Sequence, residues 1–255
     1  MTQRFYMKIS YNGKNYIGWQ IQPSGKSIQE IIEKALSQIL QKNIRITGSG
    51  RTDSGVHALC QMAHFDLSKP VNPSELKWSL NKLLPPDIRI LELDNADPTF
   101  HARYNAKEKT YRYYFSFDEI LSPFDIGYIY HIRKPLDIEL MKKGAEKLTG
   151  THDFTSFTNK GTIVKSHVRT IYSIELIHQK DHSYCLEFKG NGFLYKMVRN
   201  LSGALFDLGH HKITLDDLNL ILEEKDRRKA PRAAPAHGLF LANVAYNPNS
   251  CSKDS

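Results

Sequence analysis

The sequence contains few cysteines and no long apolar run. Its three cysteines, Cys60, Cys185 and Cys251, are far apart, odd in number and without Cys-x-x-Cys spacing. This pattern argues against a disulfide framework and a zinc site, and it favours a reducing cytosol. No apolar stretch approaches the roughly 20 residues that cross a bilayer, and no charged-then-apolar leader opens the chain. We therefore expect a soluble, cytoplasmic protein.

Positive charge is in excess, with a formal net charge of +8. A basic chain favours a polyanionic partner, because each neutralised phosphate releases counterions. The 12 phenylalanines and 13 tyrosines fit such a partner, since aromatic faces can stack unpaired bases. A plain solvated basic surface is the alternative that composition leaves open.

The spacing of apolar residues predicts strands interleaved with helices. At 255 residues the chain is long enough for one large domain or two ordinary ones. We predict an N-terminal half over 1–120, a C-terminal half over 121–247 and a disordered tail over 248–255. The expected strands are 4–11, 56–66, 88–93, 107–117, 171–177, 184–189 and 239–246, and the expected helices are 27–40, 73–84, 136–148, 191–209 and 214–222.

The stretch 48–58 is the part of the chain that packing does not explain. Its three glycines, Gly48, Gly50 and Gly55, allow positive φ and close approach, and they frame Arg51 and Asp53. The alternative is that Asp53 only hydrogen-bonds its own turn, as Asp before Ser-Gly commonly does. Because the loop runs directly into an expected strand, we interpret it as a site that presents a charged pair.

Several other side chains are candidates for a site. Tyr111 begins a strand whose aromatic residues alternate, and we place it in a cleft while the others face the core. His101 and Arg103 are phosphate-binding or loop-anchoring groups, with a structural histidine as the alternative. Arg199 lies in an otherwise apolar helix, so it needs an anionic partner or must extend to water. For Trp19 we favour a place in the core over base stacking.

Two catalytic classes are disfavoured by what surrounds the loop. A glycoside hydrolase typically needs two cooperating carboxylates, and no second one matches Asp53 near the loop. A phosphate-cradling nucleotide site would require a Gly-Lys-Ser/Thr ending, which the chain lacks. A non-catalytic RNA-binding module remains as an alternative, although it leaves Asp53 without a purpose.

Seven short motifs are spread over nearly the whole chain. They are Tyr11-Asn12-Gly13, Gly18-Trp19-Gln20, residues 51–58, Phe100-His101-Ala102-Arg103, residues 109–113, residues 191–200 and His237-Gly238-Leu239. These motifs resemble those of the tRNA pseudouridine synthase A family and stand in the family's order. Ser54 stands where the family usually has Ala, and Asn12 where it usually has Asp, but neither change removes a reacting group.

The resemblance implies an α+β fold with a mixed, largely antiparallel sheet and flanking helices. It implies two similar ferredoxin-like or RRM-like halves around a central cleft. The implied activity is isomerisation of uridine to pseudouridine at positions 38, 39 and 40 in the anticodon stem-loop of tRNA, with no organic cofactor or catalytic metal. It also implies a homodimer that binds tRNA. A sister synthase acting on another RNA is the closest alternative.

The resemblance further implies roles for single residues. Asp53 is the catalytic residue, as a nucleophile at C6 of the base or C1′ of the ribose, or as the base that starts a glycal route. Arg199 is the cation that keeps it ionised in a partly dry pocket. Tyr111 stacks on the target base and is a candidate for removing the C5 proton. Arg51 holds the vacated stack or the phosphates during base flipping, and Leu239 packs on the ring.

Overall fold

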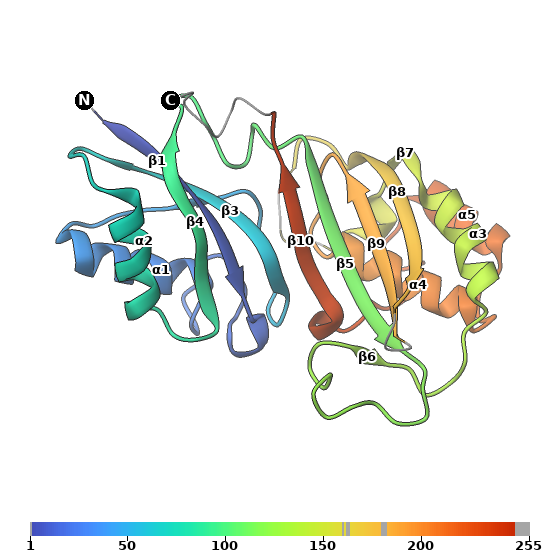
Figure 1. Cartoon of the computed structure of the whole chain (residues 1–255). Coiled ribbons are helices and arrows are strands. Elements are labelled where there is room, and N and C mark those ends of the chain that lie inside the picture. The colour runs from blue at the N-terminus through green and yellow to red at the C-terminus, as the bar shows by residue number, and fades with distance from the viewer. Residues whose placement is uncertain (1, 160, 162–163, 180–182, 248–255) are drawn as a thin grey trace. The chain divides into compact units, whose positions relative to one another are not determined.

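The computed structural model describes residues 2–159, 161, 164–179 and 183–247 (Figure 1). Residues 2–108 and 240–247 form one compact unit, and the described residues from 109 to 239 form a second. We call these unit 1 and unit 2. The predicted halves are 1–120, expected to carry the loop with Asp53, and 121–247, expected to complete the active-site cleft. This division stays a prediction. The predicted disordered tail, 248–255, lies outside the described residues.

Unit 1 contains a sheet whose strands follow the order β4-β1-β3-β10. Strand β1 is antiparallel to both β3 and β4, so that Phe5 lies opposite Phe65 and Asn95. Strand β10 runs parallel to β3, and the short β2 pairs with the other part of β3. The bounds are β1 (Gln3–Tyr11), β2 (Thr47–Gly48), β3 (His57–Leu67), β4 (Ile88–Ala96) and β10 (Leu239–Ala245).

Two helices, α1 (Ile28–Leu40) and α2 (Pro73–Leu83), cover one face of this sheet (Figure 1). The Ser27 side chain caps α1 by accepting from Glu30 N, and Asn72 caps α2 ahead of Pro73. Both are favoured N-terminal arrangements, because they satisfy amide donors that have no partner within the helix. Both helices bury apolar residues along one face, and β1 buries Phe5, Met7 and Ile9, so the core of unit 1 lies between helices and sheet.

Unit 2 contains strands in the order β5-β9-β8-β7, all antiparallel to their neighbours, with β6 parallel to β5. Phe206 of α4 contacts Tyr113 and Phe115 of β5 and forms the centre of an aromatic core. The strands are β5 (Glu108–Ser116), β6 (Tyr130–His131), β7 (Gly150–Asp153), β8 (Val168–His178) and β9 (Tyr184–Gly190). The helices are α3 (Ile138–Leu148), α4 (Met197–Gly209) and α5 (Leu215–Glu224).

Three short 3₁₀ turns complete the described elements, η1 (Gly13–Asn15), η2 (Thr155–Phe157) and η3 (Ala236–Gly238). The first precedes the segment that contacts the Asp53 loop, and the last leads into β10. None of the described helices is long and apolar enough to cross a membrane.

The expected strands and helices are all present, and the predicted α+β class with a largely antiparallel, mixed sheet is confirmed. The start of α4 was predicted wrongly. The helix begins at Met197 rather than at 191, because Asn191 still pairs with Thr170 of β8 through its backbone and side chain. Lys196 then adopts a left-handed conformation at φ 58°, which separates this strand end from the helix. Apolar spacing does not reveal such an interruption.

Candidate active site

The loop that carries Asp53 is held on one side by the segment that follows η1. Trp19 N donates to Thr52 O at 3.1 Å, and Gly55 N donates to Tyr16 O at 3.3 Å. Gly18 makes this contact possible, because it has φ +106° and a Cβ there would lie 2.4 Å from Thr52 O. Only glycine tolerates both conditions. The Gly18-Trp19 motif of the sequence is therefore the wall of the Asp53 loop.

The other side of the loop is fixed by buried polar groups of β3. Gln61 is fully buried, accepts from Ser49 Oγ at 2.7 Å and donates to Gly50 O at 3.0 Å. Tyr11 reaches the loop from β1, with its hydroxyl 2.8 Å from Thr52 Oγ1. Burial raises the pKa of Tyr11, so this hydroxyl keeps its proton at neutral pH. Each of these bonds limits the freedom of the backbone on either side of Arg51.

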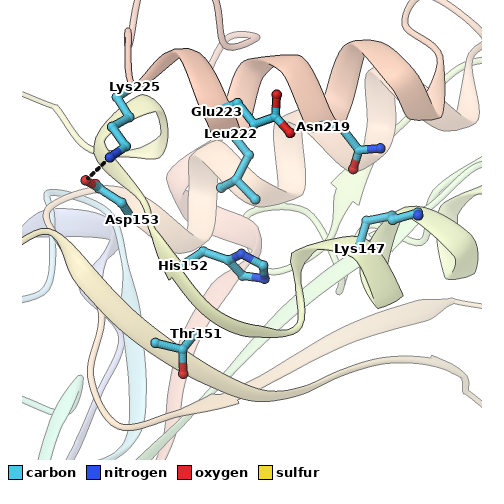
Figure 2. A pocket seen from close by; sticks show the side chains of 8 residues that line it. All are labelled: Lys147, Thr151, His152, Asp153, Asn219, Leu222, Glu223 and Lys225. Atoms are coloured by element: carbon cyan, nitrogen blue, oxygen red, sulfur yellow. Dashed lines mark ion pairs between the residues drawn. The ribbon is translucent and has the colours of Figure 1, made fainter.

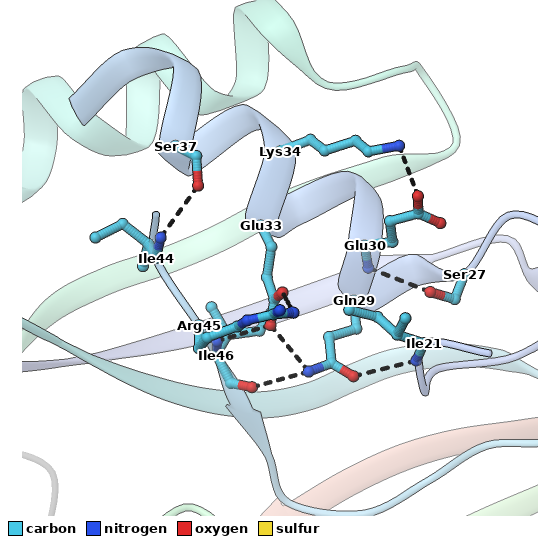
Figure 3. Close-up of polar contacts among 10 residues, drawn as sticks. All are labelled: Ile21, Ser27, Gln29, Glu30, Glu33, Lys34, Ser37, Ile44, Arg45 and Ile46. Carbon is cyan, nitrogen blue, oxygen red and sulfur yellow. Dashed lines mark hydrogen bonds and ion pairs between the residues drawn. The ribbon is translucent and has the colours of Figure 1, made fainter. Parts of the chain in front are cut away.

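A buried network behind the loop holds the strand that leads into it (Figure 3). Glu33 of α1 accepts from Ile46 N at 3.0 Å and from Arg45 at 2.9 Å. Gln29, one helical turn earlier, donates to Glu33 at 2.9 Å and to Ile46 O at 3.1 Å, while its Oε1 accepts from Ile21 N. Both side chains are buried. The network joins α1, the segment between η1 and α1 through Ile21, and the entry to β2.

The two charged residues of the loop differ in exposure. Arg51 is exposed, whereas Asp53 is half-buried and its carbonyl accepts from Val56 N at 3.1 Å. Of the three loop glycines, Gly55 alone has positive φ, at +77°. His57, in the same motif, is buried and structural, because its Nδ1 accepts from Gly13 N and its ring stacks on Phe240. Trp19 is 2% exposed, which confirms its place in the core.

His101 and Arg103 lie beside the sheet of unit 1, after Phe100. His101 Nδ1 accepts from the backbone N of Arg103 at 3.1 Å and of Tyr104 at 3.3 Å. Burial, together with the charge of Arg4, lowers the pKa of His101, so its ring is neutral at pH 7. Of the alternatives open for this residue, the geometry favours the loop anchor. Arg103 is exposed.

In unit 2 the central aromatic residues of β5 face the core, as their alternation in the sequence predicted. Tyr113 and Phe115 are fully buried, and Tyr113 donates to Pro235 O at 2.8 Å. Tyr111 is also mostly buried and meets Phe193 edge-on, with ring centroids 5.2 Å apart. Phe117 is only half-buried and stacks on Tyr184. Tyr111 is therefore held by its ring at the end of an aromatic row.

Arg199 is fixed to the segment that precedes η3. Its Nε donates to Ala234 O at 2.8 Å, and its own carbonyl accepts from Ala234 N at 2.9 Å. The side chain is half-buried on α4. Leu239, at the start of β10, is buried. The reciprocal bonds lock the turn of α4 that carries Arg199 against the chain leading to Leu239.

Most of the basic side chains in the run over 225–232 have hydrogen-bond or ion-pair partners within unit 2. Arg227 donates to Asn200 Oδ1 at 2.9 Å and to Ala230 O at 2.8 Å, and burial lowers its pKa. Lys225 pairs with Asp153, and Arg228 pairs with Asp226. Arg227 thus has a structural role, because it holds Asn200, the residue that follows Arg199 on α4.

A cavity of about 510 Å³ in unit 2 is lined by residues of α3, β7 and α5 (Figure 2). It contains none of the predicted site residues, and the Lys225–Asp153 ion pair, at 3.3 Å, forms part of its wall. One of the lining residues is His152, whose Nε2 is already hydrogen-bonded to Thr149 O. The lining residues are Lys147, Thr151, His152, Asp153, Asn219, Leu222, Glu223 and Lys225. In the described parts of the chain, no group of His, Cys, Asp and Glu side chains could hold a metal ion.

The predicted site residues fall in both units. Unit 1 carries Arg51, Asp53, His101 and Arg103, and unit 2 carries Tyr111, Arg199 and Leu239. Sequence reasoning missed the polar residues that support the loop, which are Gln29, Glu33 and Gln61. A signal for the first two was present, because they occupy i and i+4 positions beside the apolar stripe of α1.

Comparison with known proteins places the chain among RNA-modifying enzymes. A family model described as tRNA pseudouridine synthase matches residues 7–105 and 145–247, which include Asp53 and Arg199 but not Tyr111. The tRNA pseudouridine synthase A 1 of Protochlamydia amoebophila is 46% identical over 252 residues, covering 97% of this chain and 98% of the relative. The tRNA pseudouridine synthase A of Limosilactobacillus reuteri strain DSM 20016 is 41% identical over 250 residues, covering 96% and 98%. A chain in the crystal structure of a Cbf5-Nop10-Gar1 complex is similar with a TM-score of 0.33 and 12% identity, over 80% of this chain and 54% of that one.

Proposed function

The chain belongs to the tRNA pseudouridine synthase A family, and on this premise we propose that it converts uridine to pseudouridine at positions 38, 39 and 40 in the anticodon stem-loop of tRNA. The enzyme is an isomerase of tRNA. The observation that carries the proposal is the full-length match to tRNA pseudouridine synthases, at 46% identity with one relative, together with a carboxylate on a braced loop.

The reaction rearranges the uridine without adding or removing atoms. The N1–C1′ bond breaks, the uracil turns while it stays bound, and C5 forms the new bond to C1′. C5 then loses its proton, and N1 gains one. A single ionised carboxylate can start this sequence, either by attack or by proton abstraction.

We assign the starting role to Asp53. It acts as a nucleophile at C6 or C1′, or as the base that begins a glycal route. Its support is the rigidity of the loop, which is held by Tyr16, Trp19 and Gln61. A reacting group must be kept within a fraction of an ångström of its productive position, and such bracing serves that requirement.

Arg199 is proposed to keep the carboxylate of Asp53 ionised and oriented. A guanidinium is suited to this role, because its planar fork binds carboxylates through two parallel bonds and stays charged. Its Nε donates to Ala234 O at 2.8 Å, which fixes the side chain on α4, and the guanidinium is proposed to bind the carboxylate of Asp53 from that position.

The remaining site residues are proposed to bind the substrate. Tyr111 stacks on the target base, and Leu239 packs on the same ring. Arg51, which is exposed, holds the vacated stack or the phosphates while the uridine is flipped out. Arg103 contacts the backbone of the RNA, and His101 anchors the turn that carries Arg103.

Assembly and location are also part of the proposal. A homodimer that binds one tRNA across both subunits would enlarge the basic surface offered to a long RNA. We place the enzyme in the cytoplasm, and no cofactor is needed for the bond exchange described above.

The test is tritium release from tRNA transcripts labelled at C5 of uracil, with the wild-type chain and Asp53→Asn compared. We expect release by the wild type and a fall of at least about a thousandfold in the variant, close to 4 kcal/mol of activation free energy. Affinity for tRNA should be kept, since Asn preserves the shape of the side chain. Near-normal turnover by Asp53→Asn would refute the role of this residue.

The wild type provides the control for the substrate. Release that maps to positions 38–40 supports the proposed target. Release confined to other uridines would mean that a different site in RNA is the substrate, and binding without any release would favour a non-catalytic RNA-binding protein.

A further inference from the structure

Tyr104 of unit 1 presents an aromatic ring to solvent, with 74% of the residue exposed. The ring is nevertheless fixed on one side, because it packs against the ring of His101 in a tilted arrangement, with centroids 4.2 Å apart and an interplanar angle of 31°. The Arg103 guanidinium lies 5.8 Å from the same ring. Neither the core nor the proposed catalytic residues account for a tyrosine in this position.

The support beneath Tyr104 is a pair of histidine rings that hydrogen bonds hold in place. His101 is held by the bonds from Arg103 N and Tyr104 N to its Nδ1, and it contacts His64 at 4.7 Å. The Nδ1 of His64 accepts from Ala102 N at 3.1 Å. Tyr104 therefore loses little further freedom when a partner covers it, which favours binding.

The same histidine connects this surface to the Asp53 loop. His64 hydrogen-bonds the backbone of Thr47, which begins β2 and lies opposite it in the β2–β3 ladder. The loop 48–56 continues from that strand. Tyr104 is thus connected to the entry of the Asp53 loop through the rings of His101 and His64.

The charge of the surface selects the kind of partner. Burial and neighbouring cations lower the pKa of His64 to about 4 and lower the pKa of His101, so both rings are neutral at pH 7. Arg103 is the exposed cation beside Tyr104. An exposed neutral ring beside one exposed guanidinium fits a base and its phosphate, since bases stack on tyrosine while arginine contacts the backbone.

We propose that Tyr104 is a platform on which an unpaired base of the tRNA stacks, other than the uridine that reacts. Arg103 holds the phosphate next to this base. The inference rests on the proposed function, because it takes tRNA as the ligand. The excess positive charge of the chain, +8, favours RNA over a protein partner for this exposed ring.

The first experiment measures the affinity for a tRNA transcript over a series of salt concentrations. Tyr104→Ala should weaken binding about 5- to 100-fold without changing the salt slope, because stacking releases no counterions. Tyr104→Phe should restore the affinity lost in Tyr104→Ala, and Tyr104→Leu should not. Arg103→Ala should reduce the salt slope by about one.

A matched control is Tyr172→Ala, which removes an exposed tyrosine from β8 of unit 2. We expect wild-type affinity from this variant. The platform would be overturned by an equal loss of affinity with Tyr172→Ala or by wild-type affinity with Tyr104→Leu. A changed oligomeric state of the free protein in Tyr104→Ala would also overturn it. The last result would assign the ring to a contact between copies of the chain.

The second experiment locates the base. Transcripts carrying 2-aminopurine at one unpaired position at a time should show quenching by the wild type at one position, and Tyr104→Ala should relieve it. Absence of any Tyr104-dependent quenching overturns the inference. If the wild type releases tritium from C5 but Tyr104→Ala binds normally, the platform fails and the proposed function stands. If the wild type releases no tritium while Tyr104-dependent quenching is seen, the platform stands and the proposed function fails.

Discussion

Unit 1 holds Asp53 on a loop, whereas unit 2 holds Arg199 on a helix, and the means of support differ accordingly. The loop is fixed by hydrogen bonds from buried polar side chains and by a glycine contact at Gly18. The helix is fixed by aromatic packing through Phe206 and by one pair of bonds to Ala234. A loop has no internal ladder of hydrogen bonds, so the surrounding elements must supply them. We therefore expect the loop to be sensitive to single polar or steric changes, and the helix to changes at the end that carries Arg199.

The largest effect is expected at the helix, from Arg199→Ala. Turnover in the tritium assay should fall at least about a thousandfold, because the cation proposed to serve Asp53 is removed. The free energy of unfolding should fall by only about 1 kcal/mol, since the bond to Ala234 O is lost while the backbone bond from Ala234 N and the aromatic packing of α4 remain. Arg199→Lys keeps the charge but not the planar fork, and it should recover only part of the rate. Unchanged turnover in Arg199→Ala would remove Arg199 from the site.

A steric change at the loop comes next. Gly18→Ala should lower the free energy of unfolding by about 3 kcal/mol, because the residue has φ +106° and the new Cβ would meet Thr52 O at 2.4 Å. Gly192→Ala in unit 2 is the matched control, with φ +155° and no described atom within 4 Å of its Cβ. Its cost should be about 1 kcal/mol, from the backbone alone. Urea unfolding measures both, and equal costs would show that the contact with the loop is not tight.

A polar change separates support of the loop from general stability. Glu33→Gln and Glu187→Gln each alter a buried carboxylate, one behind the loop and one on β9, where it pairs with Arg112 and Lys189. Both should lower the free energy of unfolding by about 2 kcal/mol. Glu33→Gln alone should also slow turnover, since the amide keeps one acceptor oxygen for Ile46 N but presents an NH2 donor to Arg45 in place of the second oxygen. If the two variants have the same turnover, the network behind the loop has no part in positioning Asp53.

The smallest effect is a dependence of stability on pH within unit 1. His64 has a pKa of about 4 in the folded chain and about 6.5 when unfolded, so the unfolded state takes up the proton first as pH falls. Stability from this group is full above 6.5 and is lost progressively down to pH 4. The loss between pH 7 and 5.5 should be about 1 kcal/mol. His64→Asn keeps an acceptor for Ala102 N and should show less of this loss in urea unfolding, and an identical pH profile would contradict the assignment.

The sequence predicted the elements better than it predicted what joins them. Apolar periodicity and the Ser27 cap located α1 to within a residue, because burial and capping leave local signals. The loop at Asp53 was located by its glycines and charges. The bonds of Gln61 and Arg227 depend on partners 11 and 27 residues away, and nothing local indicates them. The late start of α4 follows from a pairing between Asn191 and Thr170 that spacing cannot show.

The two tryptophans of the chain give this loop an optical signal of its own. Trp19 is 2% exposed and lies so close to β2 that a Cβ on Gly48 would come within 2.6 Å of its ring, whereas Trp78 is 61% exposed beside Lys82. The indole in the core should emit at shorter wavelength and resist iodide quenching, and the exposed one should do neither. In a Trp78→Phe chain, the remaining fluorescence would come from the wall of the Asp53 loop alone. Mixing such a chain with tRNA in a stopped-flow instrument would then time the response of that wall to substrate.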